Sequence, residues 1–166
     1  LPQALKLLDT INRYNAIGFI EALREVRYEC GLATLAILDG PSGLSAPGGL
    51  KVHDAPLTWI ADNQMKGISI DVPAITIHAN ATFAEEHWDS HDNLRGKIML
   101  DAAAPFLKAN VIEFNCHRWG FTTPINPWSE QYFHSAELHL TLAGDSFGGA
   151  RIEGAALSGF AAASKV

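Results

Sequence analysis

The stretch from Ala143 to Ala163, AGDSFGGARIEGAALSGFAAA, constrains the fold more than any other part of the sequence. A strand pattern ends in Gly144-Asp145 and is followed by a glycine turn and a helix of very small residues. Each glycine inside a helix costs about 1 kcal/mol relative to alanine, so this helix needs a contact that offsets the cost. Small residues such as Gly154 and Gly159 therefore predict that another backbone packs closely against it.

The start of this helix is also a predicted binding point. Gly148 and Gly149 allow backbone conformations that other residues resist. The first-turn N–H groups near Arg151, Ile152 and Glu153 have no partner within the helix, and the helix dipole adds positive charge there. An electron-rich carbonyl or an anionic ring edge is a suitable ligand. From the pattern alone, an ordinary closing helix rich in glycine and alanine remains an equal alternative.

The rest of the chain predicts an α+β fold of mostly antiparallel sheet packed with helices. Helical patterns cover residues 2–8, 17–24 and 92–107, and strand patterns cover 26–40, 56–63, 73–83, 111–119 and 138–142. The turn after residue 63 predicts a hairpin with the strand that begins at 73. No repeat or low-complexity linker divides the sequence, which favours one compact unit.

Composition excludes some classes of function. The net charge of −6 argues against a nucleic-acid surface, and no apolar run reaches the roughly 18 residues of a transmembrane helix. Cys30 and Cys116 form no disulfide framework, so a reducing, cytoplasmic location is expected.

Several motifs together resemble a known family. The terminal motif is similar to the C-terminal flavin motif of the flavin amine-oxidase superfamily. LPQALKLL, VRYECGLATLAILD, PLTWIADNQMKG and HRWGF look like successive landmarks of bacterial renalase-like FAD-dependent oxidoreductases. The resemblance covers essentially the whole chain. It implies a substrate-binding domain over residues 1–136, followed over 137–166 by the last strand, turn and helix of an FAD-binding domain.

The resemblance also implies roles for individual residues. Asp145 is expected to contact the ribityl or phosphate part of FAD, and the N–H of Ile152 to face the N1–C2=O edge of the flavin. Negative charge builds on that edge when flavin accepts a hydride. Arg151 and Glu153 flank this point. The expected cofactor-binding set is Gly144, Asp145, Arg151, Ile152, Glu153 and Ala155.

One part of the family pattern is missing. The G-x-G-x-x-G fingerprint that binds the adenine and pyrophosphate of FAD does not occur in this sequence. The chain is therefore expected to correspond to the later half of the family, with an N-terminal FAD-binding half as its missing partner. Two functions stay open. One is hydride transfer from a dihydronicotinamide or amine substrate to flavin with reoxidation by oxygen, and the other is a non-catalytic binding module that does not retain FAD.

Candidate substrate contacts lie elsewhere. Trp59, His117 and Trp119 are expected to shape a substrate pocket, although each also fits a place in the core or at a half-buried edge. Asn63 and Lys66 are suited to orienting an anionic or amide-bearing ligand, with a solvated turn as the alternative for Lys66. No catalytic residue is assigned, because no nucleophile or acid–base arrangement is recognisable.

The segment EEHWDSH raises the question of a metal. His87 and His91 are four residues apart and have acidic neighbours, which is compatible with a divalent metal and a hydrolase. The motif is not H-E-x-x-H, and no third ligand is evident. We therefore expect no metal and interpret the segment as a solvated loop or helix start.

Overall fold

The computed structural model describes residues 1–11 and 18–165, and the chain forms two compact units. Unit 1 comprises Leu1–Glu29 and Phe121–Val166, and unit 2 comprises Cys30–Gly120. The expectation of one compact unit is therefore wrong, because the buried side chains gather into two separate clusters. The boundary expected at 136/137 falls inside unit 1, and the division into substrate and cofactor domains stays a prediction.

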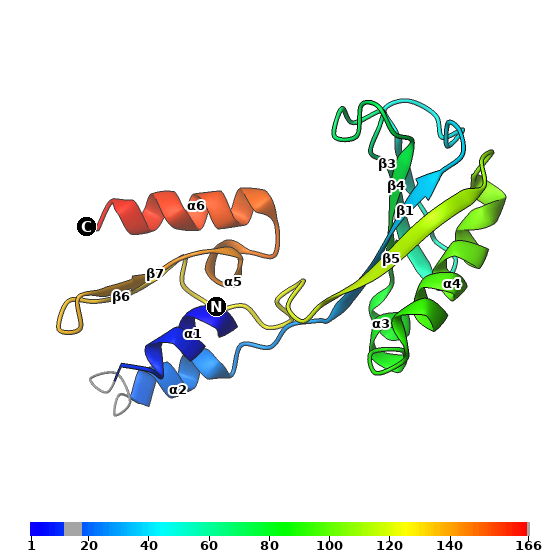
Figure 1. Ribbon diagram of the computed structural model, residues 1–166. Coiled ribbons are helices and arrows are strands. Elements are labelled where there is room, and N and C mark those ends of the chain that lie inside the picture. Colours follow the sequence, from blue (N-terminus) through cyan, green and yellow to red (C-terminus); the bar gives the residue numbers. More distant parts are fainter. Residues whose placement is uncertain (12–17, 166) are drawn as a thin grey trace. The chain divides into compact units, whose positions relative to one another are not determined.

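Unit 2 is built on a five-stranded antiparallel sheet with the order β2-β3-β4-β1-β5 (Figure 1). The strands are β1 (Gly31–Leu38), β2 (Gly49–Lys51), β3 (Leu57–Asp62), β4 (Ala74–Ala79) and β5 (Val111–Trp119). The expected hairpin is confirmed, since β3 and β4 pair antiparallel. At the base of the unit, Gly31 of β1 pairs with Trp119 of β5.

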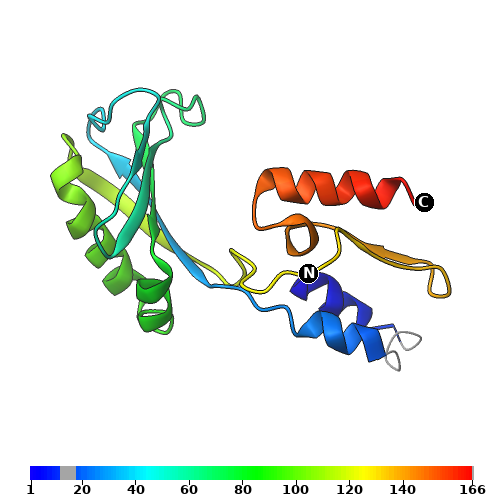
Figure 2. The same cartoon turned by 180° about the vertical axis from the view of Figure 1, so that it is seen from behind.

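Helices cover one face of this sheet. In Figures 1 and 2, α4 (Asp92–Ala103) runs along the sheet and α3 (Ala81–Glu86) lies beside one end of it. Alternate strand residues such as Ile60, Ile75 and Ile77 are fully buried there with Met99 of α4. Because strand side chains alternate between faces, the intervening residues lie on the opposite face, which no helix of unit 2 covers.

Unit 1 has a smaller core and mostly short elements. They are α1 (Pro2–Leu8), α2 (Gly18–Arg24), β6 (Phe133–Ser135), β7 (Leu140–Leu142), α5 (Asp145–Gly148) and α6 (Ile152–Ala163). The predicted helix over 2–8 is confirmed, and Ile17 of the second predicted helix lies outside the described residues. The core of the unit consists of Leu5, Leu8, Ile20, Leu23 and Phe147.

The small residues of α6 do allow a close backbone approach. Gly154, Ser158 and Ala162 are the buried residues of this helix, and they follow one another at helical spacing of four. A Cβ added at Gly154 would lie 2.5 Å from the carbonyl oxygen of Gly149. A Cβ added at Gly159 would meet no described atom within 4 Å, so close packing at Gly159 stays a prediction.

Some boundaries differ from the sequence pattern for local reasons. The strand expected over 73–83 stops at Ala79 because the Asn80 side chain accepts a hydrogen bond from the N–H of Phe83 and so caps α3. The helix expected over 92–107 gives way at Ala104 to a 3-10 turn (Ala104–Phe106) that contains Pro105. Within the described ranges, no helix combines the length and the apolar character needed to cross a bilayer.

Candidate functional site

The three expected substrate contacts lie on one surface, the face of the unit 2 sheet that α3 and α4 leave uncovered. We call this surface the open face. The strand register aligns five residues across all five strands in the order Lys51, Trp59, His78, Ala33 and His117. Directly paired residues point to the same side of a sheet, so Trp59 and His117 share this face. Trp119 follows His117 on the same side of β5.

Trp59 has a fixed orientation on this face. A Cβ added at its neighbour Gly49 would lie 2.6 Å from the indole ring, so the indole lies directly over the glycine of β2. The side chain is nevertheless 40% exposed. Trp59 therefore presents part of a positioned aromatic surface to solvent, and it does not belong to the core of the unit.

His117 and Trp119 form a second aromatic group at the other edge of the sheet. Their ring centroids are 4.6 Å apart in an edge-to-face arrangement. Cys116 points the opposite way and is buried in the core, which agrees with the alternation of side chains along β5. The contact between the two rings holds an imidazole beside an exposed indole.

His78 lies between these two groups, and the sequence analysis did not select it. Partial burial, together with the nearby positive charge of Lys66, lowers the pKa of His78. Two residues before His78 on β4, Oγ1 of Thr76 accepts a hydrogen bond from Nδ2 of Asn63 at 2.9 Å. The alternation along 74–79 already placed His78 on the polar face of a half-buried strand. What the sequence lacked was the register that aligns it with Trp59 and His117.

A second candidate site is the start of α6 in unit 1. No side chain caps this helix, so the first-turn N–H groups remain available as donors. A cavity of about 450 Å³ borders it and is lined by Gly148, Gly149, Arg151, Glu153, Gly154 and three neighbours, Thr123, Ala150 and Leu157. Gly149 has a φ of 108°, a conformation that requires glycine.

Only two of the six expected cofactor-binding residues line that cavity. Arg151 and Glu153 line it, whereas Ile152 and Ala155 do not. The Ile152 side chain is 92% exposed, so a role for this residue would fall to its backbone N–H. Gly144 donates its N–H to Oγ of Ser158 at 2.9 Å, which ties the strand end to the middle of α6.

Asp145 already has partners within the chain. Tyr28 donates its hydroxyl to Oδ1 of Asp145 at 3.3 Å and also contacts Oγ of Ser146. Partial burial is the main cause of the raised pKa of Tyr28, and the negative charge of Asp145 adds to it. The sequence analysis missed this role of Tyr28, because the residue is more than 100 positions away and meets Asp145 only through tertiary packing. Asp145 therefore has a structural role beside any contact to a ligand.

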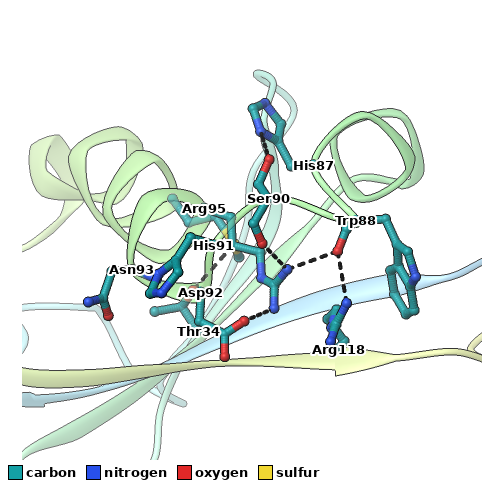
Figure 3. A network of polar contacts seen from close by, with 10 residues as sticks. Thr34, His87, Trp88, Ser90, His91, Asp92, Asn93, Arg95 and Arg118 are labelled. Carbon is teal, nitrogen blue, oxygen red and sulfur yellow. Dashed lines mark hydrogen bonds and ion pairs between the residues drawn. The ribbon is translucent and has the colours of Figure 1, made fainter.

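The two histidines of EEHWDSH each contact a different neighbouring residue (Figure 3). Nδ1 of His87 is 3.3 Å from Oγ of Ser90, and Nδ1 of His91 accepts from the N–H of Asn93 at the start of α4. Across residues 1–11 and 18–165, no group of three or more histidine, cysteine or acidic side chains is arranged to hold a metal ion. The hydrolase interpretation has no support from this geometry.

The same segment contains a buried arginine (Figure 3). Arg95 is 1% exposed and donates from Nη1 to the carbonyl oxygens of Trp88 and Ser90 at 2.9 and 2.8 Å. Its Nη2 pairs with Asp92. Arg118 of β5 donates to the same Trp88 oxygen and lies 5.5 Å from the centre of the Trp88 ring. This network fixes the loop between α3 and α4 and attaches it to the strand that carries His117.

No protein-family model matches this sequence. Among solved structures, the chain is similar to a protein from Exiguobacterium sp. 255-15 described as a putative protoporphyrinogen oxidase, with a TM-score of 0.57 and 13% sequence identity. The match covers 99% of this chain and 39% of that chain. At this identity the likeness concerns the fold alone. The α+β fold with a mostly antiparallel sheet, predicted from the sequence, is thereby confirmed.

Proposed function

We propose that this chain is part of a renalase-like, FAD-dependent oxidoreductase of the flavin amine-oxidase superfamily. The observation that carries the proposal is the uncapped start of α6, where a cavity of about 450 Å³ meets free backbone donors. The sequence motif there resembles a flavin motif, and the fold likeness to a protein named as an oxidase extends over nearly the whole chain. Bound FAD would supply hydride acceptance from a dihydronicotinamide or amine substrate and reoxidation by oxygen.

Each unit would have its own part in this function. In unit 1, Gly144, Asp145 and the first turn of α6 would hold one edge of the cofactor, with Arg151 and Glu153 beside it. In unit 2, the open face would bind the substrate through Trp59, His117 and Trp119. These side chains offer flat surfaces and hydrogen-bonding groups, which orient a substrate and exclude water from it.

A missing partner would complete the cofactor site. The side of α6 that faces away from α5 exposes Ile152, Leu157 and Phe160, of which Phe160 is 75% exposed. Apolar side chains at this spacing are normally covered by another element. We propose that an N-terminal dinucleotide-binding half covers them in a longer, cytoplasmic protein.

One observation favours the second candidate function, a binding module that does not retain FAD. The expected cofactor contacts come from a single strand-turn-helix in unit 1, and the sequence contains no G-x-G-x-x-G for the pyrophosphate. FAD would then lose most of its contacts in the 166-residue chain. On this interpretation the open face still binds its ligand, and the chain has no oxidase activity by itself.

An absorbance titration separates the two candidates. The purified chain is incubated with excess FAD, freed of unbound cofactor and examined between 350 and 500 nm. A retained flavin spectrum supports the oxidoreductase for this chain, and a colourless protein supports the binding module. In a longer gene product that retains FAD, Asp145→Ala should lower the flavin content without unfolding the protein. Asp101→Ala, on an exposed position of α4, is the matched control, and equal flavin content in both variants contradicts the assignment of Asp145.

A further inference from the structure

β5 is the outermost strand of the unit 2 sheet, and one of its long edges has no neighbouring strand. Among the described residues it pairs with β1 alone, along its whole length. Most residues of β5 are exposed, whereas most residues of β1, which has strands on both sides, are buried. Antiparallel strands direct alternate backbone N–H and C=O groups to each side, so about half of those of β5 point away from β1. Such a row of groups is a template for a further strand.

The features that usually block a strand edge are confined to one end of β5. The register with β1 shifts between Ile37 and Leu38, so Ile112 is the extra residue of a β-bulge. Over residues 113–119 the register is regular, and this part of the strand contains no lysine or proline. The edge beyond the bulge is therefore suited to pairing.

A cavity of about 460 Å³ lies beside this edge, between α4 and the start of β5, which run next to each other in Figure 1. Leu100 of α4 and Ala104 and Leu107 of the following turn form one apolar wall. Ile112 and Phe114 of β5 form the other. The described lining includes no residue of β1, so the cavity lies on the outer side of the sheet. A side chain of an added strand could enter it.

The charges in the cavity are mainly positive. Lys97 of α4 and Lys108 of the turn before β5 line it, together with one carboxylate, Asp101. The whole chain has a net charge of −6, so this local excess of positive charge is opposite in sign to the rest of the molecule. It favours a ligand that carries an acidic group.

The turn that carries Lys108 is held in place by contacts to the end of β1 and the loop after it. The N–H of Lys108 donates to the carbonyl oxygen of Ser42 at 2.9 Å, and a Cβ added at Gly43 would lie 2.5 Å from Cγ of Lys108. Asn110 donates its N–H and its Nδ2 to the carboxylate of Asp39 at 2.8 and 2.9 Å. The lysine stem and this wall of the cavity are therefore positioned before any ligand binds.

We propose that the edge of β5 and this cavity together bind an extended peptide of a partner protein. The peptide adds to the sheet antiparallel to β5, places a large apolar side chain in the cavity and places an acidic side chain beside Lys108. Backbone hydrogen bonds along the edge supply affinity, and the cavity supplies specificity. Side chains on one face of a strand are two residues apart, so the recognised sequence is a large apolar residue followed two positions later by Asp or Glu. The site goes beyond the proposed function, whose substrate contacts lie on the open face.

Matched peptides test this inference. The blocked peptide acetyl-TVTLTD-amide is the probe, with leucine as its apolar residue and aspartate as its acidic residue. One control peptide has asparagine in place of the aspartate, and another has alanine in place of the leucine. Each is titrated into the nitrogen-15-labelled 166-residue chain, and the shifts of the amide resonances give Kd. Amide hydrogen exchange with and without the peptide shows which N–H groups of β5 become protected.

The bound peptide should protect alternate amides of β5, because only those that point away from β1 gain a partner. Loss of the leucine side chain should weaken binding about tenfold, and loss of the aspartate charge about fivefold. Ala104→Phe partly fills the cavity, so it should weaken the leucine peptide and change the alanine peptide little.

Charge variants of the chain test the lysines directly. The double variant Lys97→Met with Lys108→Met should bind the aspartate and asparagine peptides equally. The matched double variant Lys6→Met with Lys165→Met changes two exposed lysines of unit 1 and should keep the full difference. Circular dichroism at 222 nm verifies that each variant is folded.

Other results would overturn the inference. It fails if no peptide binds at millimolar concentration, if the amides of β5 show no alternate protection, or if the variant without Lys97 and Lys108 still prefers aspartate. A dimer of the chain, seen by sedimentation, whose β5 amides are protected without peptide would show that a second copy occupies the edge. Protected β5 amides in a longer gene product would show that the same protein covers it, which also contradicts a partner peptide. None of these outcomes depends on FAD.

Discussion

Replacement of Gly154 by alanine tests the close approach between α6 and the turn before it. The added Cβ would lie 2.5 Å from the Gly149 carbonyl oxygen, 2.7 Å from the Gly148 carbonyl oxygen and 2.9 Å from the Gly148 carbonyl carbon. The shortest of these falls about 0.9 Å below the 3.4 Å at which ordinary contact begins. All three atoms belong to the backbone, so no side-chain rotation relieves the overlap.

The cost is estimated from two opposing terms. Overpacking of this kind typically costs about 1–3 kcal/mol. Alanine gains about 1 kcal/mol over glycine inside a helix, partly because it restricts the unfolded chain. Gly159→Ala, five positions along the same helix, gains the second term without the first, since a Cβ there meets no described atom within 4 Å. The difference between the two variants therefore isolates the steric term, and we expect Gly154→Ala to be about 1–3 kcal/mol less stable than Gly159→Ala.

Urea denaturation followed by circular dichroism at 222 nm measures both free energies of unfolding. Amide hydrogen exchange of α6 shows whether the change is local to this helix. Gly159→Ala should be more stable than the wild-type chain. The reasoning is refuted if Gly154→Ala is as stable as Gly159→Ala, because the backbone of the turn would then not be in the described contact with the helix.

Two further variants test buried polar contacts. Arg95→Met leaves the carbonyl oxygen of Ser90 without its donor and removes one of the two donors to the Trp88 oxygen. The free energy of unfolding, measured by urea denaturation, should therefore fall by about 2–4 kcal/mol. A loss below about 1 kcal/mol would show that the network is not formed. Tyr28→Phe removes the contact of the phenol with Ser146 and should cost about 1 kcal/mol at pH 7. Because the folded-state pKa of Tyr28 is raised, its contribution is fully present below about pH 10 and is lost as the pH rises through the folded pKa. The stability difference between wild type and Tyr28→Phe should thus shrink in alkaline solution, and a constant difference would contradict the raised pKa.

Local sequence patterns predicted the long elements well and the site only in part. Val111–Trp119 and Pro2–Leu8 were found with their observed bounds, because their apolar and polar residues repeat with a clear period. The short strands β2 and β6 were missed, since three residues carry too little pattern to distinguish a strand from a loop. The motif in α6 predicted a close backbone approach at Gly154 and Gly159, and among the described residues only Gly154 makes one.

The remaining site residues depend on contacts between distant parts of the chain. His78 and His117 are 39 positions apart, and only their common pairing with Ala33 places them in one row. Tyr28 and Asp145 meet through tertiary packing that no local motif encodes. Sequence periodicity indicates which face of a strand a residue occupies, whereas the order and register of strands follow from the whole fold.

The pairing of Gly31 with Trp119 has a consequence for how such a chain is assembled from modules. The start of β1 and the end of β5 are paired, so the 91-residue segment Cys30–Gly120 begins and ends at adjacent points. On the unit 1 side, the N–H of Glu29 donates to the carbonyl oxygen of Thr123 at 2.9 Å, which keeps the two crossing segments together. Segments with adjacent ends can be lengthened, shortened or exchanged with little strain on the host. On the proposed function, substrate recognition in unit 2 can therefore diversify while the glycine-rich turn and helix of unit 1 keep their sequence.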